Sequence, residues 1–220
     1  MLPLGDASRR PVHVPVVTAG IIAINALVFV LEIAGGEPFI RRWSVVPADI
    51  TAGQNWITIV TAMFLHGGWE HIVGNMLFLW AFGPEIEDVM GPVRYLAFYL
   101  LGGLTATAAQ IAASPASTIP NLGASGAIAA VMGAFLTTYP RDKIRTLVFL
   151  GWFVTVTVVP AMLLVGLWFV MQLFSEVGAL ATVQAGGVAY LAHIGGFIMG
   201  FITARLFEDP ERLAYQRWRE

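Results

Sequence analysis

A serine, three histidines and an asparagine are the residues of this chain whose types and spacing could do chemistry. Ser125 lies in the stretch Gly-Ala-Ser-Gly-Ala (residues 123–127), and Pro120 and Asn121 before it indicate a loop that ends where a helix begins. A serine at a helix start either caps free backbone N–H groups or acts as a nucleophile whose oxyanion those groups hold. Ala127 breaks the Gly-x-Ser-x-Gly motif of soluble hydrolases, so the serine pattern taken alone favours capping.

His71 and Asn75 are four residues apart, so they share one face if the segment is helical. Polar residues in apolar segments often form hydrogen bonds between helices. They also mark functional sites, because ionisable groups in a membrane are costly. For His71 and Asn75 we favour a functional role as donors to an oxyanion. For His66, in the turn before them, we expect a hydrogen bond that fastens the loop.

His193 lies in an apolar stretch with Gly196 and Gly200 on its helical face. The segment that starts at Ser125 carries small residues at every fourth position. These are Ser125, Ala129 and Gly133, and in parallel Gly126, Ala130 and Ala134. Small-residue stripes permit close helix packing, which would bring His193 to Ser125 as a base to a nucleophile. No acidic residue is well placed as a third member, since Glu32, Glu70 and Glu176 lie near the ends of apolar segments.

The composition indicates a polytopic membrane protein. The chain has 220 residues, of which 57% are hydrophobic and 12% charged, against about 25% charged in soluble domains. This composition argues against a nucleic-acid partner. The chain has no cysteine, which excludes disulfides and thiolate metal sites. No acidic residue is spaced to complete a metal site with the histidines, and no glycine-rich phosphate loop occurs, so we expect neither a metal nor a cofactor.

We expect an all-α fold of six membrane spans in one domain. The predicted spans are residues 14–34, 69–82, 94–113, 125–139, 160–175 and 188–207. The fourth is short, which suggests that it begins inside the membrane beside a cavity. This divides the chain into an N-terminal tail (1–13) that includes a solvated His13, the membrane domain (14–207) and a solvated C-terminal tail (208–220).

Three segments outside the spans have distinct characters. Residues 36–67 mix polar and apolar side chains and suit the membrane interface, with Trp43 and Trp56 at headgroup depth. Residues 144–158 are also expected at the interface, and residues 175–187 form a flexible loop.

The distribution of positive charge predicts the orientation. Only Arg41 and Arg42 fall on the side opposite the termini. Ten fall on the termini's side: Arg9, Arg10, Arg94, Arg141, Lys143, Arg145, Arg205, Arg212, Arg217 and Arg219. Both termini are therefore expected in the cytoplasm, with the protein in a plasma or inner membrane.

Taken together, these motifs resemble the rhomboid intramembrane serine proteases. The resemblance covers nearly the whole chain and rests on motifs that are weak singly but specific in order. They are Phe64-Leu65-His66 with His71 and Asn75, then Gly123-Ala124-Ser125-Gly126, then Ala192-His193 with Gly196 and Gly200.

The resemblance implies six helices around a water-filled cavity open to the non-cytoplasmic side. It implies that Ser125 attacks a peptide bond of a transmembrane substrate, with His193 as base and then acid. The oxyanion hole would comprise His71, Asn75 and the Ser125 N–H. It further implies that residues 36–67 form a lateral loop, that residues 175–187 cap the cavity, and that the fifth span gates substrate entry.

Two positions depart from the pattern. Many relatives carry Trp-Arg eight to nine residues before the His66 position, where this chain has Ile57 and Thr58. Some relatives carry a tyrosine four residues after the serine that stacks on the catalytic histidine. Here that position is Ala129, so something else must orient His193.

Two other functions remain open from the sequence. His71, Asn75 and His193 could line the polar path of a transporter. The same fold could bind client helices as a non-catalytic scaffold. Neither the physiological substrate nor the oligomeric state follows from the sequence.

Overall fold

The computed structural model describes residues 1–151, 153–181 and 190–218 of the chain. Its helices are α1 (Val16–Trp43), α2 (Pro47–Thr51), α3 (Thr58–Thr61), the 3₁₀ helix η1 (Ala62–Phe64), α4 (Trp69–Met90), α5 (Pro92–Ala113), α6 (Ser125–Thr138), α7 (Ala161–Ala181), α8 (Tyr190–Phe207) and α9 (Pro210–Trp218). Its strands are β1 (Leu2–Asp6), β2 (Lys143–Leu150) and β3 (Phe153–Pro160). The described part is mostly helical, which confirms the predicted fold class.

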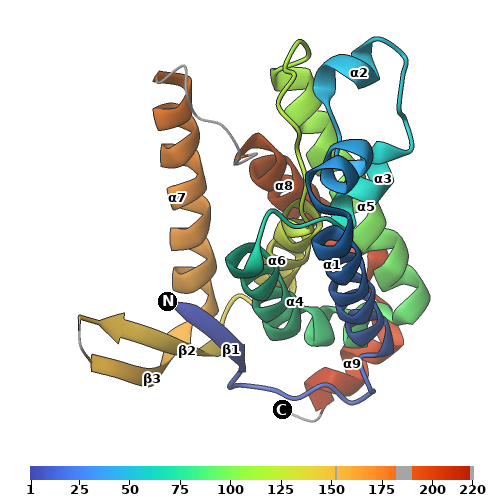
Figure 1. The fold of residues 1–220 in the computed structure, drawn as a ribbon. Coiled ribbons are helices and arrows are strands. Elements are labelled where there is room, and N and C mark those ends of the chain that lie inside the picture. The colour runs from blue at the N-terminus through green and yellow to red at the C-terminus, as the bar shows by residue number, and fades with distance from the viewer. Residues whose placement is uncertain (152, 182–189, 219–220) are drawn as a thin grey trace.

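Helix α6 forms the centre of the bundle. Every residue from Gly126 to Phe135 is buried, and α4, α5 and α8 pack around the helix (Figure 1). Its 14 residues rise about 21 Å, less than the roughly 30 Å of a hydrocarbon core. A helix of this length is too short to cross the whole hydrocarbon core.

Glycines set the close approach of α6 and α8. A Cβ atom at Gly133 would lie 2.3 Å from the carbonyl oxygen of Phe197, and one at Gly200 would lie 1.9 Å from that of Ala130. Real Cβ atoms do not approach other atoms this closely, so a side chain at either position would push the helices apart. The two backbones touch along small residues, as in other closely packed membrane helices.

Helix α1 has a kink at Gly36, where φ is 60° and the backbone leaves the helical region. Glycine tolerates this positive φ without steric cost. The sequence predicted that the first span ends near Ala34, but the helix resumes after the kink and reaches Trp43. Beyond it, α2, α3 and η1 form a folded segment that Val45 joins to Asn121 through two backbone hydrogen bonds. Its position in the membrane interface remains a prediction.

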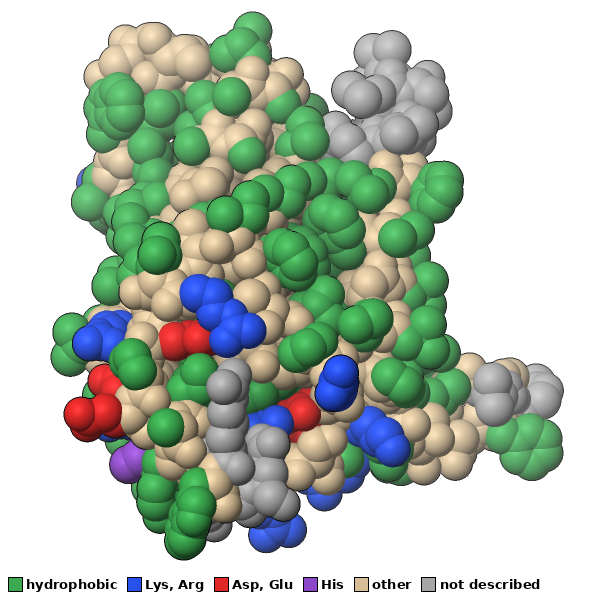
Figure 2. Space-filling view, turned by 180° about the vertical axis from the view of Figure 1, so that it is seen from behind, with side chains coloured by type: hydrophobic (Ala, Val, Ile, Leu, Met, Phe, Trp, Pro, Cys, Tyr) green, Lys and Arg blue, Asp and Glu red, His purple; other side chains and the backbone are tan. Residues whose placement is uncertain are grey.

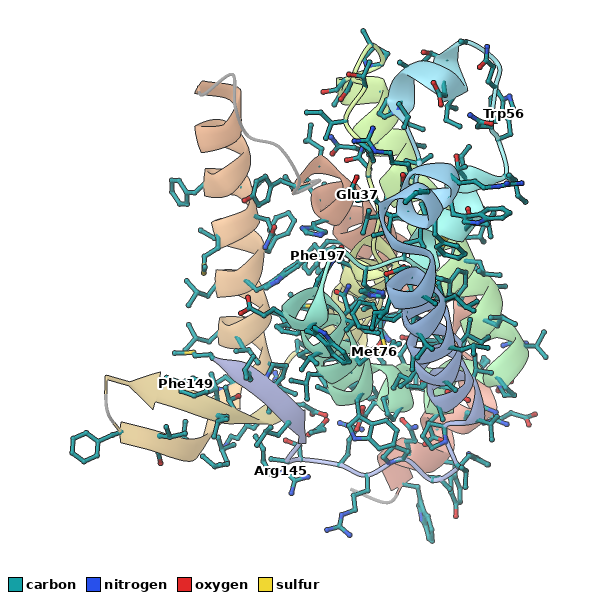
Figure 3. All side chains as sticks on the ribbon, in the orientation of Figure 1. Glu37, Trp56, Met76, Arg145, Phe149 and Phe197 are labelled. Atoms are coloured by element: carbon teal, nitrogen blue, oxygen red, sulfur yellow. The ribbon has the colours of Figure 1, made fainter. Side chains whose placement is uncertain are left out.

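Residues 143–160 form an antiparallel hairpin, and β1 adds to it as a third strand in the order β1-β2-β3. The sequence predicted no strand here. Ile144 and Thr146 are buried while Lys143 and Arg145 are exposed, which is the two-residue alternation of a strand. The hairpin extends away from the helix bundle, and Phe149 lies on it (Figure 3).

Both tails are folded against the bundle. Arg9 binds the Asp142 carboxylate through Nε and Nη2. His13 Nδ1 lies 2.6 Å from Asp88 Oδ1, so the prediction of a merely solvated His13 is corrected. The C-terminal tail includes helix α9, most of which is exposed, and its buried Gln216 donates to Asp88 Oδ2 at 2.7 Å. These contacts between segments distant in sequence leave no signal in local composition.

The helices and the surface are those of an integral membrane protein. Among the described residues, α1, α5 and α8 are long and apolar enough to cross a membrane, and Ser125–Thr138 and Ala161–Phe174 are shorter apolar helices. On the face seen in Figure 2, most charged side chains lie in the lower half, and the upper half shows hydrophobic side chains interspersed with other side chains and backbone. The count of six spans remains a prediction. Helix α7 takes up residues 175–181 of the predicted loop, and residues 182–187 of that loop lie outside the described residues.

Candidate active site

Ser125 and His193 meet at the contact between α6 and α8. The Oγ atom of Ser125 lies 2.7 Å from Nε2 of His193, within hydrogen-bond distance. The serine is the first residue of α6, where backbone N–H groups have no partner within the helix. Gly196 keeps α8 close, because a Cβ atom there would lie 2.1 Å from the carbonyl oxygen of Gly126. Gly126 in turn packs against α5, where its own Cβ would lie 2.5 Å from the Ala106 Cβ.

His71 faces the same point from α4. Its Nδ1 accepts a hydrogen bond from the Gly67 N–H at 3.2 Å, so the neutral ring carries its hydrogen on Nε2. That Nε2 points toward Gly123, where a Cβ atom would lie 2.9 Å from it and 3.5 Å from Ser125 Oγ. Gly123 also has a backbone φ of 131°, which residues other than glycine rarely adopt. A glycine is therefore required between the imidazole and the serine.

Asn75 lines the same cavity one helical turn after His71. The cavity has a volume of about 340 Å³, and its walls come from α4, α6, α7 and α8, with Ser125, His71 and His193 among its lining residues. Asn75 is buried, and its Nδ2 atom has no hydrogen-bond partner among the described residues. An unpaired buried donor at a cavity that contains a serine hydroxyl is suited to bind a developing negative charge.

His66 lies beside the cavity but holds the loop through its backbone. Its N–H donates to both carboxylate oxygens of Glu32 in α1, at 2.9 and 3.1 Å. The imidazole is buried 5.1 Å from the ring of His71, and neither ring nitrogen has a hydrogen-bond partner in the part of the chain that is described. The hydrogen bond that fastens this loop to α1 is thus made by the main chain of His66.

The surroundings of His193 include two side chains of α7 that the sequence analysis did not single out. Nδ1 of His193 lies 2.8 Å from Oε1 of Gln172. The ring of Trp168 lies 5.8 Å from the imidazole at an angle of 45°. Ala129, at the position of the tyrosine that stacks on the histidine in some relatives, is buried inside the bundle. The available signal was a lone glutamine inside an apolar span, because polar groups there need a partner.

Whether the described side chains could hold a metal ion depends on how closely the possible ligands cluster. Across residues 1–151, 153–181 and 190–218, no three His, Cys, Asp or Glu side chains cluster as metal ligands would. His71 and His193 instead face the serine from two sides, each with its second ring nitrogen engaged by another group. The site has the parts of nucleophilic catalysis by a serine hydroxyl.

The helices α4, α6 and α8 that carry these residues all lie within a segment that matches a known family. A sequence model of the Rhomboid domain matches residues 53–209, well over half of the chain. The chain belongs to the rhomboid family.

Individual relatives of this rhomboid are longer than the chain itself. It is 30% identical over 205 residues to Rhomboid protease GluP of Bacillus subtilis, which covers 91% of this chain and 36% of GluP. It is 28% identical over 189 residues to Rhomboid protein 1, mitochondrial, of Saccharomyces cerevisiae, covering 83% of this chain and 50% of that protein. It is 30% identical over 203 residues to RHOMBOID-like protein 12, mitochondrial, of Arabidopsis thaliana, covering 85% of this chain and 57% of that protein. The chain thus spans between about a third and just over half the length of these relatives.

Proposed function

We propose that this rhomboid is an intramembrane serine endopeptidase with Ser125 as nucleophile and His193 as general base and acid. The observation that carries the proposal is the 2.7 Å contact between Ser125 Oγ and His193 Nε2 at the wall of a cavity. A nucleophile within hydrogen-bond reach of a base is the signature of covalent catalysis by serine. The name of the relative GluP, a rhomboid protease, adds support.

The proposed reaction is acyl transfer to Ser125. Its Oγ attacks the peptide carbonyl carbon while the hydroxyl proton passes to His193 Nε2. The carbonyl oxygen becomes an oxyanion, for which His71 Nε2–H, Asn75 Nδ2–H and the Ser125 N–H are the proposed donors. The imidazolium then gives its proton to the leaving amine as the C–N bond breaks. Water, deprotonated by His193, hydrolyses the acyl ester and restores the hydroxyl.

The proposed substrates are transmembrane proteins cut near the non-cytoplasmic surface of the bilayer. The excess of Lys and Arg on the termini's side, ten against two, supports cytoplasmic termini in a plasma or inner membrane. In this arrangement α7 is the candidate gate for substrates that enter from the lipid, and residues 36–67 form a lateral loop. The lipid bilayer is the other partner, and no cofactor takes part.

The experiment that tests the proposal is cleavage of a model transmembrane substrate in proteoliposomes by wild-type, Ser125→Ala and His193→Ala proteins. Both variants are expected to lose cleavage while their thermal unfolding midpoints stay near that of the wild type. Ser114→Ala, an exposed loop serine, is the matched control and should cleave normally. Cleavage by Ser125→Ala at the wild-type rate would contradict the proposal. A wild-type protein that binds clients without cutting them would favour the scaffold.

A further inference from the structure

His193 contacts Ser125 with one ring nitrogen and α7 with the other. Its Nε2 lies 2.7 Å from Ser125 Oγ and its Nδ1 lies 2.8 Å from the side-chain oxygen of Gln172. Gln172 is half-buried, on a helix separate from those that carry the serine and the histidine. The histidine is thus fixed at both nitrogens, by groups from two different helices.

The chemistry of the two ring nitrogens makes the Gln172 contact directional. A neutral imidazole has one N–H donor and one acceptor nitrogen. The amide oxygen of Gln172 only accepts, so its bond keeps the hydrogen on Nδ1 and leaves the Nε2 lone pair facing the Ser125 hydroxyl. The other tautomer would place a hydrogen on Nε2 and could not take the serine proton. An acidic residue performs this task in serine triads.

A second contact from the same face of α7 fixes the plane of the ring. Trp168 is four residues before Gln172, so both side chains project from one side of the helix. The indole lies 5.8 Å from the imidazole and also lines the cavity. Phe169 of α7 further stacks on Phe197 of α8 with ring centroids 4.4 Å apart, and Phe197 is visible between the two helices in Figure 3.

We propose that Gln172 is a positioning residue that sets the tautomer and orientation of His193, with Trp168 as a packing support for the ring. The inference rests on the proposed function of Ser125 and His193. Gln172 touches neither substrate nor reacting atoms and acts through the imidazole. Because Gln172 and Trp168 both belong to α7, displacement of this helix from α8 removes both contacts at once.

The test compares Gln172→Leu, which removes the acceptor, with Gln172→Glu, which keeps one. Cleavage of a transmembrane substrate is measured for kcat and KM across pH 6 to 9, with thermal unfolding as a check on folding. Gln172→Leu should lower kcat by roughly ten- to hundredfold with KM within about twofold, less than the ~10⁴-fold loss when a triad carboxylate is replaced by an amide that enforces the wrong tautomer. Met171→Leu, on the exposed side of α7, is the matched control and should match wild type.

Gln172→Glu distinguishes a hydrogen-bonding role of Gln172 from a packing role, because a packing role would not change the pH profile. Its carboxylate accepts from Nδ1–H, so kcat should recover to within a few-fold of wild type. The acidic limb of the pH profile should shift to higher pH, because the carboxylate stabilises the imidazolium. In ¹⁵N spectra, His193, identified by its loss in His193→Ala, should show a protonated Nδ1 in wild type and a tautomer mixture in Gln172→Leu.

The outcomes separate this inference from the function on which it rests. If wild-type protein cleaves, and folded Gln172→Leu cleaves equally well with the same His193 tautomer, only the role of Gln172 is overturned. If the Ser125→Ala protein cleaves the substrate as fast as wild type, the proposed function is overturned, and this inference with it.

Discussion

Gly196 of α8 lies against the carbonyl oxygen of Gly126 in α6, so close that a Cβ atom at Gly196 would stand 2.1 Å from that oxygen. Gly126 directly follows Ser125, and Gly196 lies three residues after His193. A very close backbone contact between the two helices therefore lies next to the pair of side chains that meet. One turn further along α8, Gly200 repeats the contact with Ala130.

Substitution of Gly200 by alanine should separate α6 from α8. The new Cβ would lie 1.9 Å from the Ala130 carbonyl oxygen, and backbone atoms cannot move aside as a flexible side chain can. Overpacking of this kind costs about 1–3 kcal/mol. We expect a lower thermal unfolding midpoint in detergent and weaker cleavage. Gly20→Ala is the control, because a Cβ there meets nothing within 4 Å. Equal unfolding midpoints for the two variants would contradict the packing argument.

Asn75→Asp should test the proposed oxyanion donor with almost no change of shape. The amide Nδ2 has no partner among the described residues, and an ionised carboxylate at this position offers no donor and repels a negative charge. Loss of one oxyanion donor costs about 10²–10³-fold in kcat in a serine protease. We expect a fall of that order with little change in KM. A kcat within about threefold of wild type would show that Asn75 does not act on the transition state.

Glu32→Leu should destabilise the protein more than Glu32→Gln does. The carboxylate accepts the buried N–H of His66, and leucine would leave this donor unpaired at a cost of about 1–3 kcal/mol. Glutamine retains one acceptor oxygen and should stay close to wild type. Thermal unfolding in detergent measures the difference. If both variants unfold at the same midpoint, the hydrogen bond does not hold the loop.

The pH dependence of stability should include a contribution from Asp6, which lies in β1 outside the membrane-spanning helices. Burial raises the pKa of its carboxyl to about 7, against 3.8 for the free group, despite the hydrogen bond from the Ser8 N–H. The folded protein therefore binds a proton that the unfolded chain has released. Stability falls as the pH rises from about 4 to about 7.

Asp6→Asn should flatten this part of the profile, because the amide does not titrate. Thermal unfolding midpoints measured at pH 5 and pH 8 give the comparison. Glu37→Gln, which changes a carboxylate on α1 that is 81% exposed and paired with Arg41, is the control and should keep the wild-type slope. An unchanged slope in Asp6→Asn would show that another group carries the dependence.

Local patterns in the sequence predicted the parts of the site that lie along one helix. Pro120 and Asn121 marked the start of α6 at Ser125, and the four-residue spacing of His71 and Asn75 placed both on one face of α4. The glycines on the expected helices of Ser125 and His193 indicated how closely two backbones could approach. Each of these inferences needs only helical periodicity and residue size.

Contacts between distant segments could not be predicted in the same way. Burial alternates along the strand from Lys143 to Phe149, but the sequence ends in four consecutive apolar residues, and its apolar length suggested an interfacial segment instead. Pairing of β1 with β2 joins residues more than a hundred positions apart and has no local signature. The contact of Gln172 with His193 likewise depends on how α7 packs on α8.

The most direct measurement is mass-spectrometric identification of the residue that a serine-directed fluorophosphonate modifies in the membrane-embedded protein. The nucleophile must be the hydroxyl beside His193 Nε2, so the adduct should appear on Ser125 in wild type and be lost in folded His193→Ala. An adduct on another residue, or active wild-type protein in which Ser125 stays unmodified, would contradict the account.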